Sequence, residues 1–567
     1  MKKMKFSEYC YTRPDFKQIK EQFGLLTKRF EASKTVTEQV QCIDEINRIR
    51  NDVDTMYTLT SIRNSIDTTD EFYEKEKDFF NEAMPEYEGW IVEIGKLLLQ
   101  SKFKKQLEEK YGSYLFDKIA VQLKTFRPEI IEDLVLENKL GTKYRKLMAS
   151  AQIDFEGAIR NLSQMGPFAE STDRNIRRRA QLAVAGFLGE HEAEIDQIYD
   201  ELVKVRTKIA KTLGFSNFVD LGYARLGRTD YQSKDVANYR KQVYTDLVPL
   251  CQKLIKKQQE RLGLPDFKYY DLNLKFLSGN AKPIGDRDYL VNEALKMYTE
   301  MSAETAEFFN YMVENELLDL EAKKGKSGGG YCTYIANYQS PFIFSNFNGT
   351  SGDVDVLTHE AGHAFQVYQS RNFSVPEYMW PTLEACEIHS MSMEFFAWPW
   401  MKQFFGEQES KYKYSHLSEA LLFVPYGVAV DEFQHFVYEN DQATPDERKA
   451  KWREIEKKYL PHKVYDDNPI MEKGCYWFRQ SHIFEVPFYY IDYTLAQMCA
   501  LQYFIRAKEN KKEAWESYLK LCQLGGSKPF LGLVAAADLM NPFVDGTIAK
   551  ITPVIEEVLN TMNDKEM

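Results

Sequence analysis

The sequence has no stretch close to the about 20 consecutive apolar residues that a membrane-spanning helix needs. Its uncharged segment at residues 420–430 is too short and contains Pro425 and Gly427, so we expect it in the core or in the wall of a cleft. The lysines in residues 1–6 are not followed by an apolar region, which is unlike a secretory signal. We therefore expect a cytoplasmic protein that has no membrane partner.

Paired cysteines and an excess of positive charge are also missing. The eight cysteines are scattered and form no Cys-x-x-Cys pair, so we expect reduced thiols instead of a disulfide framework or a redox motif. Lys and Arg number 73 against 85 Asp and Glu, a net charge of −12, whereas nucleic-acid binding depends on clustered positive charge. We interpret the basic run at residues 174–179 as a solvated helix face and expect no nucleic-acid partner.

The composition predicts a globular, mainly α-helical protein. Apolar residues make up 44% of the chain and charged residues 28%, which allows a large core under a polar surface. Apolar residues recur three and four positions apart, the spacing of amphipathic helices, in residues 38–55, 192–212, 235–262 and 288–318. At 567 residues the chain is long enough for several domains, and we divide it into two helical domains, residues 1–190 and 191–567.

The best candidates for strands lie between Gly328 and Asn346. Residues 327–352 contain no charged side chain, although 28% of the whole chain is charged. This segment is therefore expected to be buried or to line a groove, and its three consecutive glycines allow close approach of the backbone.

The sharpest signal is a His-Glu-x-x-His motif formed by His359, Glu360 and His363. Residues four apart differ by about 40° around a helix axis, so both imidazoles face one way and can bind one metal ion. Glu360 would lie beside them, placed to take a proton from an attacking water instead of binding the metal. Eight histidines and 85 acidic residues give fewer than about 0.02 such motifs by chance, which disfavours an accidental match.

A catalytic zinc usually has three protein ligands, so the motif calls for one more. Residues 382–394 have the pattern of a helix and supply four candidates, Glu384, Glu387, His389 and Glu394. Glu384 and Glu387 are three residues apart and share one helical face, so geometry alone does not choose between them.

A later segment combines His482 with Tyr490 and Tyr493. The two tyrosines share one helical face, and a phenol can donate a hydrogen bond to the oxyanion formed when water attacks a carbonyl. In a chain with 35 tyrosines, such a cluster is more often part of the core. The spacing therefore leaves both interpretations open.

Taken together, these segments resemble the M3 family of zinc metallopeptidases, and within it the oligoendopeptidase F branch, which includes the bacterial Pz-peptidases. The metal motif alone occurs in many families, but its combination with Glu387-x-x-Ser390 and the late His and Tyr cluster is specific. The resemblance covers most of the chain and is carried by residues 213–223, 270–272, 328–332, 359–366, 387–390, 482–493 and 525–527.

The resemblance implies a role for each of these residues. It makes His359, His363 and Glu387 the ligands of one Zn²⁺ and Glu360 the general base and acid, and it prefers Glu387 over Glu384. It implies that His482, Tyr490 and Tyr493 contact the substrate and stabilise the oxyanion. Asp355 and Glu394 resemble carboxylates that orient the ligating imidazoles.

The resemblance also implies a mainly helical body in two parts around a deep substrate channel, with the zinc at its floor and a small β element. Its substrates would be short unstructured peptides cut at internal bonds, with the C-terminal domain, residues 191–567, carrying the catalytic site. The alternatives are a zinc carboxypeptidase or dipeptidyl carboxypeptidase on a similar fold, and a helical peptide-binding scaffold without catalysis. The sequence leaves the oligomeric state, the cleavage preference and the metal used in the cell open.

Overall fold

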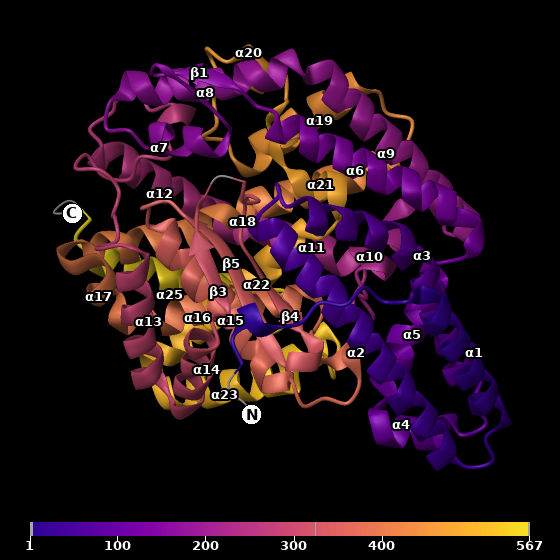
Figure 1. Cartoon of the computed structure of the whole chain (residues 1–567). Coiled ribbons are helices and arrows are strands. Elements are labelled where there is room, and N and C mark those ends of the chain that lie inside the picture. The colour runs from indigo at the N-terminus through magenta and orange to yellow at the C-terminus, as the bar shows by residue number, and fades with distance from the viewer. Residues whose placement is uncertain (1–3, 324, 565–566) are drawn as a thin grey trace.

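The protein is mainly α-helical, as the sequence predicts (Figure 1). The computed structural model describes residues 4–323, 325–564 and 567. Long helices at the N-terminal end of the chain gather on the right-hand side of Figure 1. They are α1 (Phe16–Ala32), α2 (Val36–Ile66), α3 (Glu71–Gln100), α4 (Lys104–Tyr111) and α5 (Ser113–Thr125).

The next part of the chain is also helical and includes two of the predicted helices in a divided form. A turn of π-helix at Val243–Leu247 interrupts the predicted helix at residues 235–262, and Ser302 caps a new helix inside the predicted one at 288–318. The elements are α6 (Ile131–Ala149), α7 (Gly166–Ala169), α8 (Arg174–Glu190), α9 (Glu192–Leu213), α10 (Phe218–Arg225), α11 (Ser233–Gln242), α12 (Val248–Arg261), α13 (Arg287–Met301) and α14 (Ala303–Glu314).

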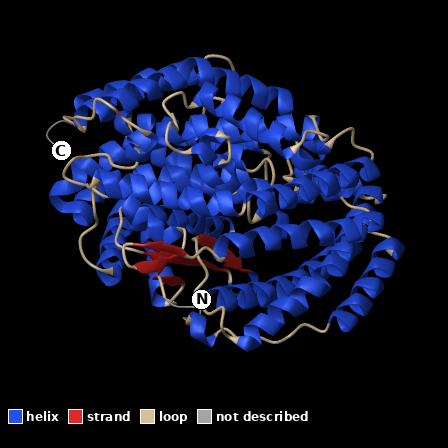
Figure 2. Ribbon diagram, turned by 90° about the horizontal axis from the view of Figure 1, so that it is seen from above, coloured by secondary structure: helices blue, strands red, loops and turns tan. Residues whose placement is uncertain are grey.

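The strands form two small sheets, and Figure 2 shows how little of the ribbon they occupy. β4 (Tyr331–Ile335) and β5 (Ser340–Phe347) lie in the predicted segment and pair antiparallel. β3 (Leu318–Glu321), which the sequence did not indicate, pairs parallel with β5, so the order is β3-β5-β4 and β4 is an edge strand. A separate hairpin joins β1 (Ile153–Phe155) to β2 (Ala158–Arg160).

The C-terminal half packs around two buried helices, α16 (Leu383–Phe396) and α22 (Tyr490–Glu509), which contact each other along their length. α15 (Gly352–Ser370) packs on α16 and on the three-stranded sheet. The remaining helices are α17 (Met401–Phe405), α18 (Glu409–Glu439), α19 (Pro445–Tyr459), α20 (Pro469–Glu472), α21 (Ser481–Glu485), α23 (Lys511–Leu524), α24 (Phe530–Ala536) and α25 (Thr547–Thr561).

Two hydrophobic clusters form the interior. The smaller is built mainly from α1 to α5, with Val375 and Tyr378 added from the loop between α15 and α16. The larger contains the sheet and the helices from α6 onward. The boundary near residue 190 stays a prediction. Within the described residues, no helix is both long and apolar enough to cross a bilayer.

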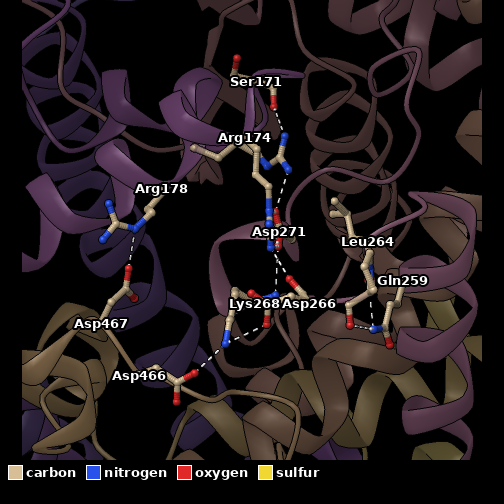
Figure 3. Close-up of polar contacts among 12 residues, drawn as sticks. Ser171, Arg174, Arg178, Gln259, Leu264, Asp266, Lys268, Asp271, Asp466 and Asp467 are labelled. Atoms are coloured by element: carbon tan, nitrogen blue, oxygen red, sulfur yellow. Dashed lines mark hydrogen bonds and ion pairs between the residues drawn. The ribbon is translucent and has the colours of Figure 1, made fainter.

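The basic run at the start of α8 is only in part the solvated face that its sequence suggested. The side chains of Arg174, Arg178 and Arg179 are 36%, 42% and 46% exposed. Arg177 is only 2% exposed and donates to Asp271 across 2.7 Å. Arg174 donates to the same carboxylate across 2.8 Å (Figure 3). Arg178 donates to Asp467 across 2.5 Å. The buried guanidinium of Arg177 needs a carboxylate partner, and its ion pair with Asp271 fastens α8 to a distant segment of the chain.

The contact between α15 and α16 depends on Gly362. A Cβ atom placed on this residue would lie 2.7 Å from the carbonyl oxygen of His389 and 2.7 Å from the Cα of Ser390. Both atoms belong to the backbone of α16 and cannot swing away as a side chain can. Glycine at this position therefore sets how closely the two helices approach.

We expect Gly362→Ala to destabilise the fold by about 1 to 3 kcal/mol, the usual cost of forcing an extra group into a packed interior. Gly186→Ala in α8 is the matched control, because a Cβ there meets nothing within 4 Å and alanine favours a helix by about 1 kcal/mol. Thermal and urea denaturation of both variants measure the difference. A Gly362→Ala protein as stable as the parent would show that α15 and α16 can move apart at no cost in stability, so that Gly362 does not set their distance.

Candidate active site

The His-Glu-x-x-His motif lies on α15 and faces α16. The Nε2 atoms of His359 and His363 lie 3.2 Å and 3.5 Å from Oε2 of Glu387. One ligand atom from each of these three residues falls within 4.8 Å of the others. Two imidazoles and one carboxylate converging in this way form a donor set suited to a catalytic zinc ion.

Glu387 is held by two further hydrogen bonds. Ser390 Oγ, one turn later on α16, donates to Oε2 across 2.9 Å, and Tyr489 OH donates to Oε1 across 2.6 Å. Burial opposes the charge of this carboxylate, but the neighbouring imidazoles of His363 and His359 hold its pKa well below the ordinary value. Glu387 is therefore an ionised and fixed donor.

His359 is oriented by a chain of hydrogen bonds that leads away from Glu387. Its Nδ1 lies 2.7 Å from Oε1 of Glu394, and Oε2 of Glu394 lies 2.7 Å from Nε2 of His416. Trp398 Nε1 donates to Nδ1 of His416 across 3.2 Å. Because an indole can only donate, His416 carries its proton on Nε2 and donates it to Glu394.

The other candidates from residues 382–394 and Asp355 have different surroundings. Glu384 is buried away from the three donors and accepts a hydrogen bond from Tyr231 OH across 3.0 Å. His389 is fully buried, and burial lowers its pKa to about 4. In the described part of the chain no hydrogen bond joins Asp355 to an imidazole, and its carboxylate accepts one from Tyr412 OH across 2.6 Å.

Glu360 lies beside the three donors with one oxygen unused. Its side chain is 8% exposed, and no described hydrogen bond reaches the buried Oε2 atom. Burial raises the pKa of this carboxyl above its ordinary value. Gly330, just before β4, is a neighbour of the other oxygen, because a Cβ atom added to it would lie at ordinary contact distance, 3.8 Å, from Oε1. The carboxylate therefore lies next to the start of the edge strand.

His482 and Tyr493 lie together next to the three donors. Tyr493 OH is 3.4 Å from Nε2 of His482, and Gln480 Nε2 donates to Nδ1 of His482 across 2.7 Å. With Nδ1 accepting, the imidazole carries its proton on Nε2. Burial lowers the pKa of His482, which favours this neutral form. Both groups can thus donate a hydrogen bond toward the site.

Tyr490, the first residue of α22, also contacts His482. Its ring packs edge-on against His482 at 4.9 Å and lies 5.7 Å from the rings of Phe423 and Tyr426. Within the described residues its hydroxyl forms no hydrogen bond to the protein. The role of Tyr490 in contacting the substrate and the oxyanion stays a prediction.

Tyr489, which sequence reasoning missed, is the tyrosine in direct contact with Glu387. It precedes α22, so an argument from shared helical faces did not include it. The preceding residue, Phe488, has a φ of 67°, and this left-handed turn sets the direction in which the chain enters α22. Arg228 holds that turn by donating to the carbonyl of Phe488 across 2.7 Å and to Asp492 across 2.5 Å.

Two family profiles and several known sequences match this chain. Residues 6–126 match the profile described as Peptidase M3 N-terminal domain, and residues 168–552 match that of Peptidase family M3. The group B oligopeptidase PepB of Streptococcus agalactiae is 23% identical over 85% of this chain and 82% of its own length. An oligoendopeptidase F homolog of Borreliella burgdorferi is 24% identical over 64% of this chain, and the match spans 61% of that protein.

Solved structures agree with these matches. A PZ peptidase A, solved with an inhibitor, is 57% identical, with a TM-score of 0.96 over 99% of this chain and 100% of that one. An oligoendopeptidase F from Enterococcus faecium is 16% identical with a TM-score of 0.63 over 97% and 99% of the two chains, which supports the fold alone. Because the matched profile covers well over half of its residues, the chain belongs to peptidase family M3, whose members are metallopeptidases.

Proposed function

We propose that this protein is a zinc-dependent endopeptidase that hydrolyses internal bonds of short, unstructured peptides. The observation that carries the proposal is the convergence of donor atoms from His359, His363 and Glu387 within 4.8 Å, with the unpaired carboxylate of Glu360 beside them. The printed names of the relatives, oligopeptidase and oligoendopeptidase, support short peptides as substrates. A cytoplasmic location is proposed on the sequence grounds given above.

The three donors fit zinc because two neutral imidazoles and one carboxylate are a common ligand set of catalytic zinc sites. A bound Zn²⁺ would lower the pKa of a water molecule and polarise the scissile carbonyl. His359, His363 and Glu387 would hold the ion, while Glu394, Ser390 and Tyr489 orient two of these ligands. The same donor types also bind other divalent metals, so the identity of the ion as zinc is part of what we propose.

The remaining residues would carry the proton transfers and hold the substrate. Glu360 takes a proton from the attacking water and returns it to the leaving amine. His482 Nε2 and Tyr493 OH donate to the developing oxyanion. The outer edge of β4, next to Gly330 and Glu360, pairs with an extended peptide backbone in the manner of an added strand.

The proposed activity is tested by mapping the products of an end-blocked peptide series by mass spectrometry. Zinc-loaded enzyme is expected to cut internal bonds of the short members only, and chelated enzyme is expected to cut none. Cleavage that needs a free C-terminus would favour a carboxypeptidase or dipeptidyl carboxypeptidase instead. Binding without cleavage by metal-loaded protein would favour a peptide-binding scaffold, which the family assignment disfavours.

Glu360→Gln is expected to lower kcat by about 10² to 10⁴ while zinc stays bound, because the amide keeps the shape but cannot accept the proton. Metal analysis of the purified variant separates this effect from loss of the ion. A variant that retains parental kcat would remove Glu360 from the proton transfer.

Glu387→Gln is expected to weaken zinc affinity by more than about 100-fold, beyond the effect of losing a residue that only orients a ligand. Glu384→Gln is the matched control on the same helix, because its buried carboxylate contacts Tyr231 and not the imidazoles. A competitive zinc titration compares both variants with the parent. If Glu384→Gln lost more affinity, the third ligand would have to be reassigned.

Tyr493→Phe is expected to lower kcat by about 10² to 10³ at unchanged zinc content, since it removes one hydrogen-bond donor to the oxyanion. Tyr490→Phe removes a hydroxyl that, among the described residues, has no hydrogen bond to His482, and it is expected to change kcat less than tenfold. Steady-state kinetics on one internally quenched peptide gives both values. The opposite order would assign the oxyanion contact to Tyr490.

A further inference from the structure

A second pocket, outside the candidate active site, lies where α16, α22 and α25 meet. Its volume is about 360 Å³, within the range of about 300 to 1,000 Å³ that small-molecule sites occupy. Phe395, Trp398 and Phe504 form an aromatic wall, and Val558 and Met562 close the side toward the C-terminus. An apolar pocket of this size accepts the body of a small ligand.

The rim of this pocket is positively charged. Among the residues that the structure describes, Lys413, Lys508 and Lys511 line it and no acidic side chain does. Lys413 is paired with Glu409, but within the described part of the chain Lys508 and Lys511 form no ion pair and instead lie over aromatic rings. In a chain with a net charge of −12, two unpaired ammonium groups beside an apolar pocket favour a ligand with an anionic head.

The wall of the pocket is linked to the candidate metal ligand His359. Trp398 forms part of the wall, and its indole donates to His416 across 3.2 Å. His416 lies 2.7 Å from Glu394, which in turn lies 2.7 Å from Nδ1 of His359. A ligand that shifts the Trp398 indole therefore acts on the group that orients His359.

We propose that this pocket binds a small amphipathic carboxylate, of the class of free medium-chain fatty acids, and that its occupancy is coupled to His359 through Trp398, His416 and Glu394. The alkyl chain packs against the aromatic wall, and the carboxylate lies between Lys508 and Lys511. The binding step does not depend on the proposed function. The coupling step rests on it, because it requires His359 to hold a metal ion.

Binding is tested by titrating decanoate into the full-length, metal-free protein and measuring the heat of binding by calorimetry and the change in tryptophan fluorescence. Saturable binding is expected, with octanoate about tenfold weaker because it buries two fewer methylene groups. Decanol and decylamine carry the same chain without the negative charge and are expected to bind at least tenfold more weakly than decanoate. Equal binding of all three probes, or no saturation, would overturn the proposed site.

The position of the site is tested with a double variant, Lys508→Ala with Lys511→Ala, which is expected to weaken decanoate at least tenfold. Lys512→Ala is the matched control, because that side chain is 86% exposed and does not line the pocket. Ala507→Phe, which fills the pocket from α22, is expected to abolish binding. Parental affinity in both the double variant and Ala507→Phe would place decanoate elsewhere.

Coupling is tested by comparing decanoate affinity with and without zinc, since linkage requires zinc affinity to change by the same factor. We expect a shift of at least about fivefold in the parent. Trp398→Phe keeps an aromatic wall but lacks the indole N–H, so it should retain decanoate binding and lose the shift. An unchanged affinity in the parent would overturn the coupling, and failure of zinc to bind would overturn it together with the proposed function.

Discussion

The close contact of α15 with α16 at Gly362 is the constraint on which the rest of the site depends. Since Gly362 has no side chain, the backbone at His389 and Ser390 approaches α15 directly. That spacing brings Glu387 within 3.2 Å and 3.5 Å of the two imidazoles. A wider separation would take the buried carboxylate away from both imidazoles and leave it only the hydrogen bonds from Ser390 and Tyr489. The packing at Gly362 and the binding of a metal ion therefore require the same separation between α15 and α16.

Around this contact, hydrogen bonds hold two of the three donors, His359 and Glu387. α16 itself supplies Ser390 to Glu387 and Glu394 to His359. The segment entering α22 supplies Tyr489, and α18 supplies His416. Because these hydrogen bonds already hold His359 and Glu387, both side chains are oriented before any ligand arrives, and this pre-organisation reduces the cost of binding.

The sequence was sufficient for features that depend on a single helix. The His359, Glu360 and His363 arrangement follows from helical geometry alone, since residues four apart always share a face. The choice between Glu387 and Glu384 does not follow from helical geometry, because the two residues share one face of α16. Only the packing of α16 distinguishes them, since it puts Glu387 against the imidazoles of α15 and Glu384 against Tyr231. The resemblance to family M3 selected Glu387, and periodicity did not.

Features that join distant segments were not predictable from local patterns. Tyr489 reaches Glu387 because Phe488 adopts a left-handed turn that Arg228, about 260 residues earlier in the chain, holds through its carbonyl oxygen. Arg177 was interpreted as solvated, with the rest of its basic run, for the same reason: Asp271, which pairs with it, lies far along the chain. Periodicity arises from backbone hydrogen bonds within a helix, whereas the partner of a buried charge is set by tertiary packing. A charged residue that a local pattern assigns to the surface, such as Arg177, can therefore be buried when a distant segment supplies its partner.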